Sequence, residues 1–323
     1  YAVENQGKKA ILVGLEGAFN NYLKGQNGQM LMEKIRGNEW KPVDDNLSIE
    51  PIPGSDIYTS IDVNIQDVAE EALLKQLKDQ KAKKGCAVLM EVKTGFVKAI
   101  ANLSYDSKSD SYFEAQNHAV GLASEPGSTF KLVTMLAGLE DQYINLNSTV
   151  NLEGGKWSFS NRTVWDSERH HRTDVTYQQA FELSSNVGMA KLAVNHYYKQ
   201  PEKFIAHLKR LKLDQPTGID LVGERRPQIT RPGDQLWGPT TLPWMAFGYN
   251  IAIAPIQTLN LYNMVANNGV MMRPYLVNSI QEEGRIIKSI TPKVYNAKVY
   301  SPATIKSAQI ALEGVCILSL IHI

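Results

Sequence analysis

The sequence predicts an α+β fold with a mostly antiparallel sheet flanked by helices. Strand-like and helix-like segments are interleaved along the 323 residues without a regular alternation. Two apolar segments, 86–92 and 96–103, are separated only by Lys93-Thr94-Gly95, which indicates an antiparallel hairpin with a tight turn. With 43% apolar and 21% charged residues, the composition is that of an ordinary globular protein.

The helices are predicted from apolar residues that recur every three or four positions. In the first helix Ile65, Val68, Ala72 and Leu77 share one face, and Gly85 is expected to end it. Further helices are expected at 127–139, at 176–194 with an interruption at Ser-Ser-Asn, at 201–213 and at 256–269. The polar stretch 104–118 is predicted to be a surface loop.

The chain divides into three segments on composition. Two prolines and a glycine within 51–54 mark a break, so we expect residues 1–50 to belong to one domain and 51–317 to another. The last six residues, 318–323, read "LSLIHI", which one reading frame of a common sequencing-library adaptor encodes. We therefore expect 318–323 to be read-through; the alternative is a genuine hydrophobic terminal strand.

Ser128 and Lys131 form the first candidate site. Pro126 and Gly127 place Ser128 at the start of a helix, and residues three apart share a helix face. A serine hydroxyl becomes a nucleophile when a neighbour takes its proton, and a buried lysine of lowered pKa can do so. The backbone N–H of Ser128 could also help to hold an oxyanion. The alternative is an N-capping serine followed by a surface lysine.

A second candidate element lies about fifty residues downstream. Ser184 and Asn186 form a Ser-x-Asn arrangement at the interruption of the helical segment. The Ser184 hydroxyl could relay a proton between lysine and a leaving group, and the Asn186 amide could hold the lysine or a substrate backbone. The alternative for this element is a helix-capping cluster.

Ser-Thr-Phe-Lys followed by Ser-Ser-Asn resembles the penicillin-binding transpeptidases, the peptidoglycan D,D-transpeptidases. The resemblance extends over almost the whole chain. Segment 14–28 is similar to the Gly-Leu-Glu segment of the pedestal domain in class B members, and 54–73 to the start of their transpeptidase domain. Segment 241–274 resembles the cell-division type from Bacteroidetes-like bacteria.

The resemblance implies a penicillin-binding/β-lactamase-like transpeptidase fold at 51–317, preceded by the end of a pedestal domain at 1–50. It implies that Ser128 is acylated with Lys131 as base, that Ser184 shuttles the proton, and that Asn186 orients the substrate or Lys131. The implied partners are stem peptides ending in D-Ala-D-Ala, β-lactams, and division proteins including a glycosyltransferase. It implies no cofactor or metal. An N-terminal anchor in the inner membrane, lost here, would leave the catalytic domain in the periplasm.

The third motif of the family, Lys-Thr-Gly or Lys-Ser-Gly after Ser-x-Asn, is the main departure. Lys93-Thr94-Gly95 has the sequence of this motif, but it precedes Ser128 instead of following Ser-x-Asn, and it is predicted to form the hairpin turn. The motif is expected a few dozen residues after 311–315, so we expect this fragment to be inactive although its parent is active. A non-catalytic scaffold or sensor, and a D,D-carboxypeptidase or β-lactamase-type hydrolase, are the alternative functions.

Other classes of function are disfavoured. The net charge of +1 lacks the basic excess expected of a nucleic-acid binder. Asp166, His170 and His171 could suggest a metal site, but adjacent histidines point apart on a strand, and a polar loop is preferred. Trp237 and Trp244 could line a substrate groove, but packing roles are preferred.

Overall fold

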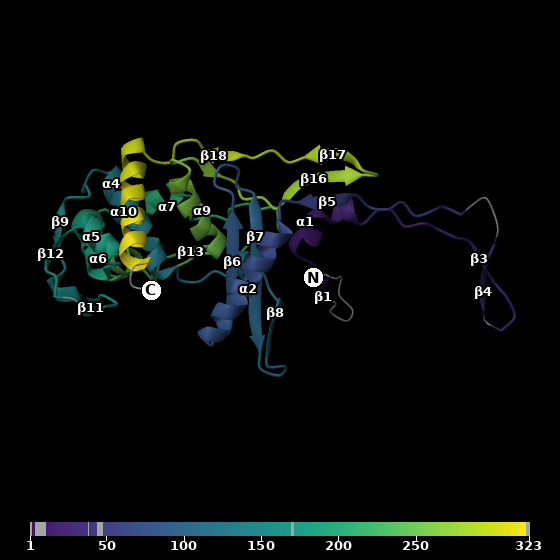
Figure 1. Ribbon diagram of the computed structural model, residues 1–323, viewed down its shortest axis with the longest axis horizontal. Helices are drawn as coiled ribbons and strands as arrows, with labels where there is room; N and C mark the ends of the chain where they lie inside the picture. Colours follow the sequence, from purple (N-terminus) through teal and green to yellow (C-terminus); the bar gives the residue numbers. More distant parts are fainter. Residues whose placement is uncertain (1, 4–10, 38, 44–47, 169–170, 321–323) are drawn as a thin grey trace. The chain divides into compact units, whose positions relative to one another are not determined.

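The structure is a computed structural model, and it describes residues 2–3, 11–37, 39–43, 48–168 and 171–320 (Figure 1). The chain folds into two compact units. The first consists of residues 1–60, 220–223 and 275–291, and the second of the remaining three segments. The first unit thus includes two later segments as well as the N-terminal one. A functional boundary near residue 50 stays a prediction.

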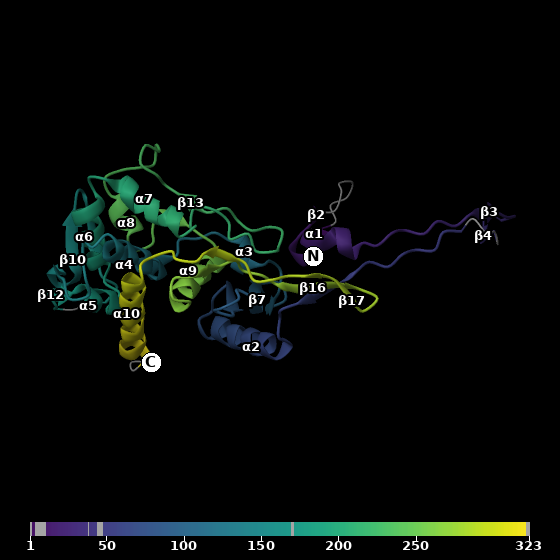
Figure 2. The ribbon, with the colours of Figure 1, turned by 90° about the horizontal axis from the view of Figure 1, so that it is seen from above.

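In the first unit a three-stranded antiparallel sheet, ordered β17-β16-β5, packs against the helix α1. Phe19 of α1 packs against Val277 and Ile280 of β16, and this apolar cluster is the core of the unit. The elements are β1 (Ala2–Val3), β2 (Ile11–Leu12), α1 (Gly14–Leu23), β3 (Met32–Lys34), β4 (Trp40–Pro42), β5 (Asp56–Thr59), β16 (Val277–Glu282) and β17 (Arg285–Ser289). Between α1 and β5 the chain forms a long two-stranded ribbon that ends in the β3–β4 hairpin (Figure 2).

The second unit begins with a helix lying on an antiparallel sheet ordered β6-β7-β8. Its elements up to this point are α2 (Val63–Asp79), β6 (Lys84–Met90), β7 (Val97–Asp106) and β8 (Ser111–Phe113). The predicted hairpin is confirmed, with Lys93–Gly95 in its turn. Gly95 has a positive φ of 81°, which glycine adopts without strain.

The expected end of the first helix at Gly85 is wrong. The helix ends at Asp79, and Lys81 takes a left-handed φ of 49° while the Ala82 N–H donates to the Leu77 carbonyl. Gly85 lies in β6 instead, where an added Cβ would stand 3.0 Å from the Leu77 side chain. A close approach of sheet to helix therefore accounts for this glycine.

The rest of the second unit is mainly helical, with short strand pairs at its margin. Its elements are α3 (His118–Gly121), η1 (Gly127–Phe130), α4 (Lys131–Glu140), β9 (Thr149–Asn151), η2 (Glu153–Gly155), β10 (Lys156–Phe159), β11 (Arg162–Trp165), β12 (Asp174–Thr176), α5 (Tyr177–Glu182), α6 (Asn186–Tyr197), α7 (Pro201–Arg210), β13 (Gln228–Ile229), α8 (Thr241–Met245), β14 (Ile251–Ala252), α9 (Pro255–Ala266), β15 (Met271–Met272), β18 (Val294–Asn296) and α10 (Pro302–Leu320). The predicted interruption at Ser-Ser-Asn is confirmed between α5 and α6.

Helix α4 forms the centre of the second unit. All of its residues except the last, Glu140, are buried, and the apolar ones belong to the main core cluster. A helix that is apolar on every side is stable only when other elements surround it. The packing therefore fixes the position of both ends of α4.

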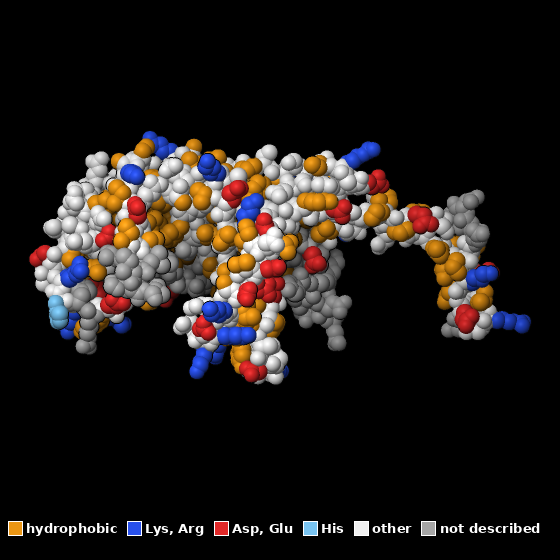
Figure 3. Space-filling model, viewed as in Figure 1, with side chains coloured by type: hydrophobic (Ala, Val, Ile, Leu, Met, Phe, Trp, Pro, Cys, Tyr) orange, Lys and Arg blue, Asp and Glu red, His pale blue; other side chains and the backbone are white. Residues whose placement is uncertain are grey.

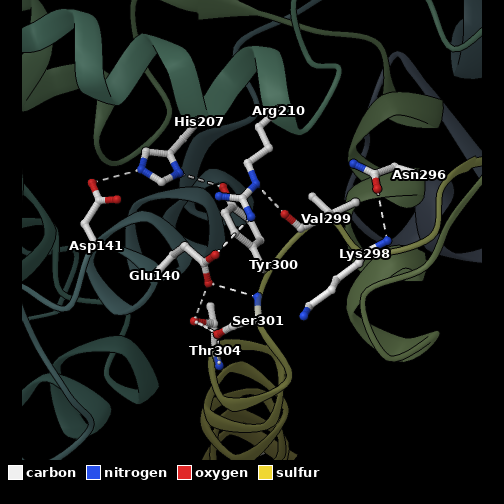
Figure 4. Close-up of polar contacts among 10 residues, drawn as sticks. All are labelled: Glu140, Asp141, His207, Arg210, Asn296, Lys298, Val299, Tyr300, Ser301 and Thr304. Atoms are coloured by element: carbon white, nitrogen blue, oxygen red, sulfur yellow. Dashed lines mark hydrogen bonds and ion pairs between the residues drawn. The ribbon is translucent and has the colours of Figure 1, made fainter.

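Polar contacts anchor the C-terminal end of α4 (Figure 4). The Glu140 carboxylate accepts hydrogen bonds from the Ser301 N–H at 3.0 Å and the Thr304 hydroxyl at 2.7 Å, and it pairs with Arg210 at 2.9 Å. The next residue, Asp141, contacts His207 Nε2 at 3.1 Å. These contacts join α4 to α7 and to the start of α10.

Two expectations about the chain ends can be compared with the structure. The backbone stays helical to Leu320, so a terminal strand at 318–320 is wrong; residues 321–323 lie outside the described residues. Read-through at 318–323 stays a prediction. In the part of the chain that the structure describes, every helix is too short or too polar to span a membrane.

Candidate active site

Ser128 lies in η1, a single 3₁₀ turn that runs directly into α4. Its side chain is exposed, while Lys131, the first residue of α4, is only 1% exposed. The structure thus presents a hydroxyl to solvent above a lysine that is almost fully removed from water. The surface lysine of the alternative interpretation is wrong, because this lysine is buried.

The Lys131 ammonium has three hydrogen-bond acceptors. Its Nζ lies 3.1 Å from Ser128 Oγ and 2.9 Å from Ser184 Oγ, and it also donates to the Ser184 carbonyl oxygen. A lysine has three N–H donors, so all of them are used. The predicted neighbourhood of Ser128, Lys131 and Ser184 is therefore present in the structure.

Burial lowers the pKa of Lys131 to about 8, because desolvation disfavours the charged ammonium. The negative charge of Asp166 acts in the opposite direction and raises that pKa. The two effects leave a lysine that can exist as the neutral amine near neutral pH. A neutral amine has a free lone pair, and at 3.1 Å that lone pair can accept the Ser128 proton.

Ser184 is held by an unusual backbone conformation. Its φ is +52°, in the left-handed region, and its N–H donates to the Phe181 carbonyl at the end of α5. Glycine is the usual residue at such a helix end, since a side chain there costs about 1–2 kcal/mol. In this conformation both the hydroxyl and the carbonyl of Ser184 reach Lys131.

Asp166, which the sequence suggested only as a possible metal ligand, holds the start of α6 instead. It accepts a hydrogen bond from the Ser185 hydroxyl at 2.8 Å and one from the Val187 N–H at 2.9 Å. The Asn186 amide donates to the neighbouring Trp165 carbonyl at 2.7 Å. Residues 165–166 thus anchor the Ser-Ser-Asn turn. The role of Asn186 toward Lys131 or a substrate stays a prediction.

A second backbone segment supports the turn that carries Ser128. The Gly127 N–H donates to the Gly248 carbonyl at 3.2 Å, and an added Cβ on Gly248 would lie 2.0 Å from the Gly127 oxygen. The Thr134 hydroxyl donates to the Ala246 carbonyl at 2.7 Å. Only glycine allows two backbones to approach this closely, so residue 248 is constrained by the position of Ser128.

The other candidates named from the sequence are two tryptophans and the possible metal ligands. Trp237 packs against the main core, and Trp244 against the cluster of Val164, Val187, Ala190 and Phe247. His170 lies outside the described residues. Among the described residues no group of three His, Cys, Asp or Glu side chains is arranged to hold a metal ion.

The geometry places an exposed serine beside a buried lysine and a second serine, and comparison with known proteins shows the family of the chain. Residues 85–316 match the model of the penicillin binding protein transpeptidase domain, and this span includes Ser128, Lys131, Ser184 and Asn186. The match covers more than half of the chain, so the chain belongs to this family.

Two curated relatives agree with this assignment. The chain is 26% identical over 319 residues to the peptidoglycan D,D-transpeptidase FtsI of Escherichia coli K12, covering 98% of this chain and 50% of that protein. It is 27% identical over 321 residues to the stage V sporulation protein D of Bacillus subtilis, covering 97% and 48%. The chain therefore spans about half the length of the curated relatives it matches.

Solved structures show the same fold. Penicillin binding protein 3 of Mycobacterium tuberculosis, complexed with ampicillin, matches with a TM-score of 0.76 and 25% identity over 94% of this chain and 63% of that one. Penicillin binding protein 2X of Streptococcus thermophilus matches with a TM-score of 0.78 and 21% identity over 97% and 46%. The predicted α+β transpeptidase fold is confirmed. A Bacteroidetes-like origin stays a prediction.

Proposed function

We propose that this chain is part of a longer serine D,D-transpeptidase that cross-links peptidoglycan stem peptides. The observation that carries the proposal is the buried Lys131 Nζ, 3.1 Å from the Ser128 hydroxyl and 2.9 Å from that of Ser184. The family match and the printed names of relatives such as FtsI support it.

In the proposed reaction neutral Lys131 takes the proton from Ser128, and Ser128 Oγ attacks the carbonyl between the two terminal D-alanines. The Ser128 N–H supplies one donor to the oxyanion. As the tetrahedral intermediate collapses, the C–N bond breaks and the proton passes from Lys131 through Ser184 to the departing D-alanine amine. An amine from a second stem peptide then attacks the acyl-enzyme and releases Ser128.

The proposal also covers the role of Asn186, the third motif, the inhibitors, and the location and partners of the longer protein. Asn186 is proposed to orient the substrate, and the third motif, which would supply a second oxyanion donor, is proposed to follow in the longer protein. β-Lactams are proposed to acylate Ser128, by analogy with the ampicillin complex of the M. tuberculosis protein. An inner-membrane anchor, a periplasmic catalytic domain, and division partners including a glycosyltransferase are proposed from the resemblance to FtsI.

The test is covalent labelling of the full-length protein with a fluorescent penicillin. Ser128→Ala should abolish labelling while the circular dichroism spectrum is unchanged, because the hydroxyl is exposed and fills no core space. Ser124→Ala, which changes an exposed serine four residues earlier, is the matched control and should label normally.

The same experiment separates the alternatives. Labelling that persists in Ser128→Ala would refute the nucleophile assignment. A wild-type protein that never labels would favour the non-catalytic scaffold. A label that is lost rapidly by hydrolysis would favour the carboxypeptidase or β-lactamase-type hydrolase.

A further inference from the structure

One hollow of the second unit is lined by residues that have no part in the proposed reaction. It has a volume of about 380 Å³ and lies where the end of α2 meets β7 and β8. Its lining consists of Lys78, Lys81, Ala82, Lys83, Tyr105 and Tyr112. We call it the lysine hollow.

The charge around the lysine hollow is concentrated. Residues 75–84 contain five lysines and one aspartate, although the whole chain has a net charge of only +1. All five lysines are exposed, and they form no ion pair within the part of the chain that the structure describes. Figure 3 shows several Lys or Arg side chains at this end of α2, with Asp or Glu side chains among them. Such a concentration of unpaired positive charge attracts anions.

The floor of the hollow is held in place by hydrogen bonds. The single proton of the Tyr112 hydroxyl is shared between the Ala82 carbonyl oxygen at 2.8 Å and the Leu77 carbonyl oxygen at 3.1 Å. In addition, the backbone N–H of Tyr105 donates a hydrogen bond to the Lys83 carbonyl oxygen at 2.8 Å. The backbone that carries the lysines is therefore fixed before any ligand arrives, which lowers the entropic cost of binding.

Two aromatic rings give the hollow an apolar surface. The centroids of Tyr105 and Tyr112 are 5.3 Å apart, and Tyr105 is 39% exposed. Aromatic rings bind the apolar C–H faces of other rings, and a tyrosine does so with little loss of conformational freedom. Rings beside ammonium groups suit a ligand that has both a flat apolar face and an anionic group.

The acidic neighbours distinguish between two kinds of partner. Asp106 and Asp110 are at the β7–β8 turn next to the hollow, and Asp110 accepts a hydrogen bond from Tyr105 at 2.7 Å. A flat anionic bilayer pressed against this end of the sheet would meet these carboxylates as well as the lysines. A sugar seated in the hollow would meet the lysines and the rings first.

We propose that the lysine hollow binds a carboxylate-bearing polysaccharide, with a sugar ring against Tyr105 and the carboxylate among Lys78, Lys81 and Lys83. This inference goes beyond the proposed function and does not depend on chemistry at Ser128. If the proposed function holds, peptide-free peptidoglycan strands, whose muramic acid units carry carboxylates, are a natural source of such a ligand.

The test measures binding of the chain to purified peptide-free glycan strands in low salt. The triple variant Lys78→Gln/Lys81→Gln/Lys83→Gln should bind about tenfold more weakly, which corresponds to about 1.4 kcal/mol. The control triple Lys199→Gln/Lys209→Gln/Lys306→Gln removes three exposed lysines elsewhere and should change binding less than twofold. Tyr105→Ser should weaken binding severalfold, whereas Tyr105→Phe, which keeps the ring, should not.

Three results would overturn the proposal. Equal losses in the two lysine triples would indicate general attraction to a polyanion. Equal binding of a neutral N-acetylglucosamine oligomer would show that the carboxylate is not recognised. Binding to phosphatidylglycerol vesicles without binding to the glycan would assign the surface to a membrane. Glycan binding should survive in Ser128→Ala, so failure here and failure of the transpeptidase proposal are distinguishable.

Discussion

The two ends of α4 have opposite effects on the charge of an ionisable side chain: the N-terminal end disfavours the charged form of Lys131, and the C-terminal end favours the charged form of Glu140. At the N-terminal end, buried Lys131 is surrounded by neutral hydroxyl and carbonyl oxygens, and desolvation lowers its pKa to about 8. At the C-terminal end, desolvation would raise the pKa of Glu140, but hydrogen bonds from Ser301 and Thr304 and the charge of Arg210 outweigh it and lower the pKa. Lys131 can therefore lose its charge near neutral pH, whereas Glu140 stays charged there.

The difference suggests separate roles for the two ends of one helix: the N-terminal end positions a group that can exchange a proton, and the C-terminal end stabilises the fold. A charge that is compensated by an ion pair and by charge-assisted hydrogen bonds contributes to folding and does not exchange protons near neutral pH. A buried charge whose hydrogen-bond acceptors are all neutral costs free energy and can titrate within the working range. We therefore expect substitutions at the two ends to have separate consequences.

The largest effect is expected at Lys131. Lys131→Met removes the proposed base but keeps an apolar stem of similar length in the buried site, so penicillin acylation of the full-length protein should slow by about 10²–10⁴-fold. Lys191→Met is the control, because Lys191 is a lysine of the same unit that pairs with Glu153. Acylation of Lys131→Met within threefold of wild type would remove the lysine from the mechanism.

An intermediate effect is expected at Ser184. Ser184→Gly relieves the left-handed strain of about 1–2 kcal/mol but removes a hydrogen bond worth about 1 kcal/mol, so the free energy of unfolding should change little. Acylation should still slow by at least tenfold, since the hydroxyl that contacts Lys131 is lost.

Stopped-flow acylation and urea denaturation on the same preparation measure both quantities for this variant. Ser185→Gly is less suitable as a control because it also removes the contact to Asp166, so Ser148→Gly, in a turn of the same unit, serves instead. A Ser184→Gly protein that acylates normally would show that its hydroxyl is structural.

The smallest effect on the reaction is expected at Glu140. Glu140→Gln weakens its charged contacts and should lower the free energy of unfolding by about 1–3 kcal/mol at pH 7. Because folding lowers the pKa of Glu140, its stabilisation is present above the ordinary carboxyl pKa and is lost as the pH falls through the folded value. The difference between variant and wild type should therefore shrink below about pH 4.

Urea denaturation at pH 7 and at pH 3 checks this prediction, with Glu313→Gln, an exposed residue of α10, as the control. Acylation by Glu140→Gln should be normal at temperatures where the variant is folded. A tenfold loss of acylation in a fully folded variant would mean that the two ends of α4 are not separate.

Local sequence patterns predicted the parts of the site that depend on spacing along the chain. Ser128 and Lys131 are three residues apart, so helical geometry alone brings them together. The hairpin turn at 93–95 and the helix interruption before Asn186 were likewise predicted from neighbouring residues in the sequence. Burial of the apolar run after Lys131 was the signal that the lysine would be desolvated.

The contacts that the sequence did not predict join distant segments of the chain. Asp166 lies eighteen residues before Ser184, and its carboxylate reaches the Ser-Ser-Asn turn only because β11 returns the chain to that place. Glu140 contacts residues 301 and 304 for the same reason. The misplaced helix end at Gly85 has a different cause, since that glycine serves sheet packing and Lys81 takes the left-handed turn.

The central claim is that neutral Lys131 is the base for Ser128, and the pH dependence of acylation tests it most directly. The acylation rate of the full-length protein should rise with pH and level off above about pH 8, as Lys131 loses its proton. Asp166→Asn removes a charge that raises the Lys131 pKa, so the same rise should move to lower pH. A rise that stays in place, or that moves to higher pH in Asp166→Asn, would contradict the account.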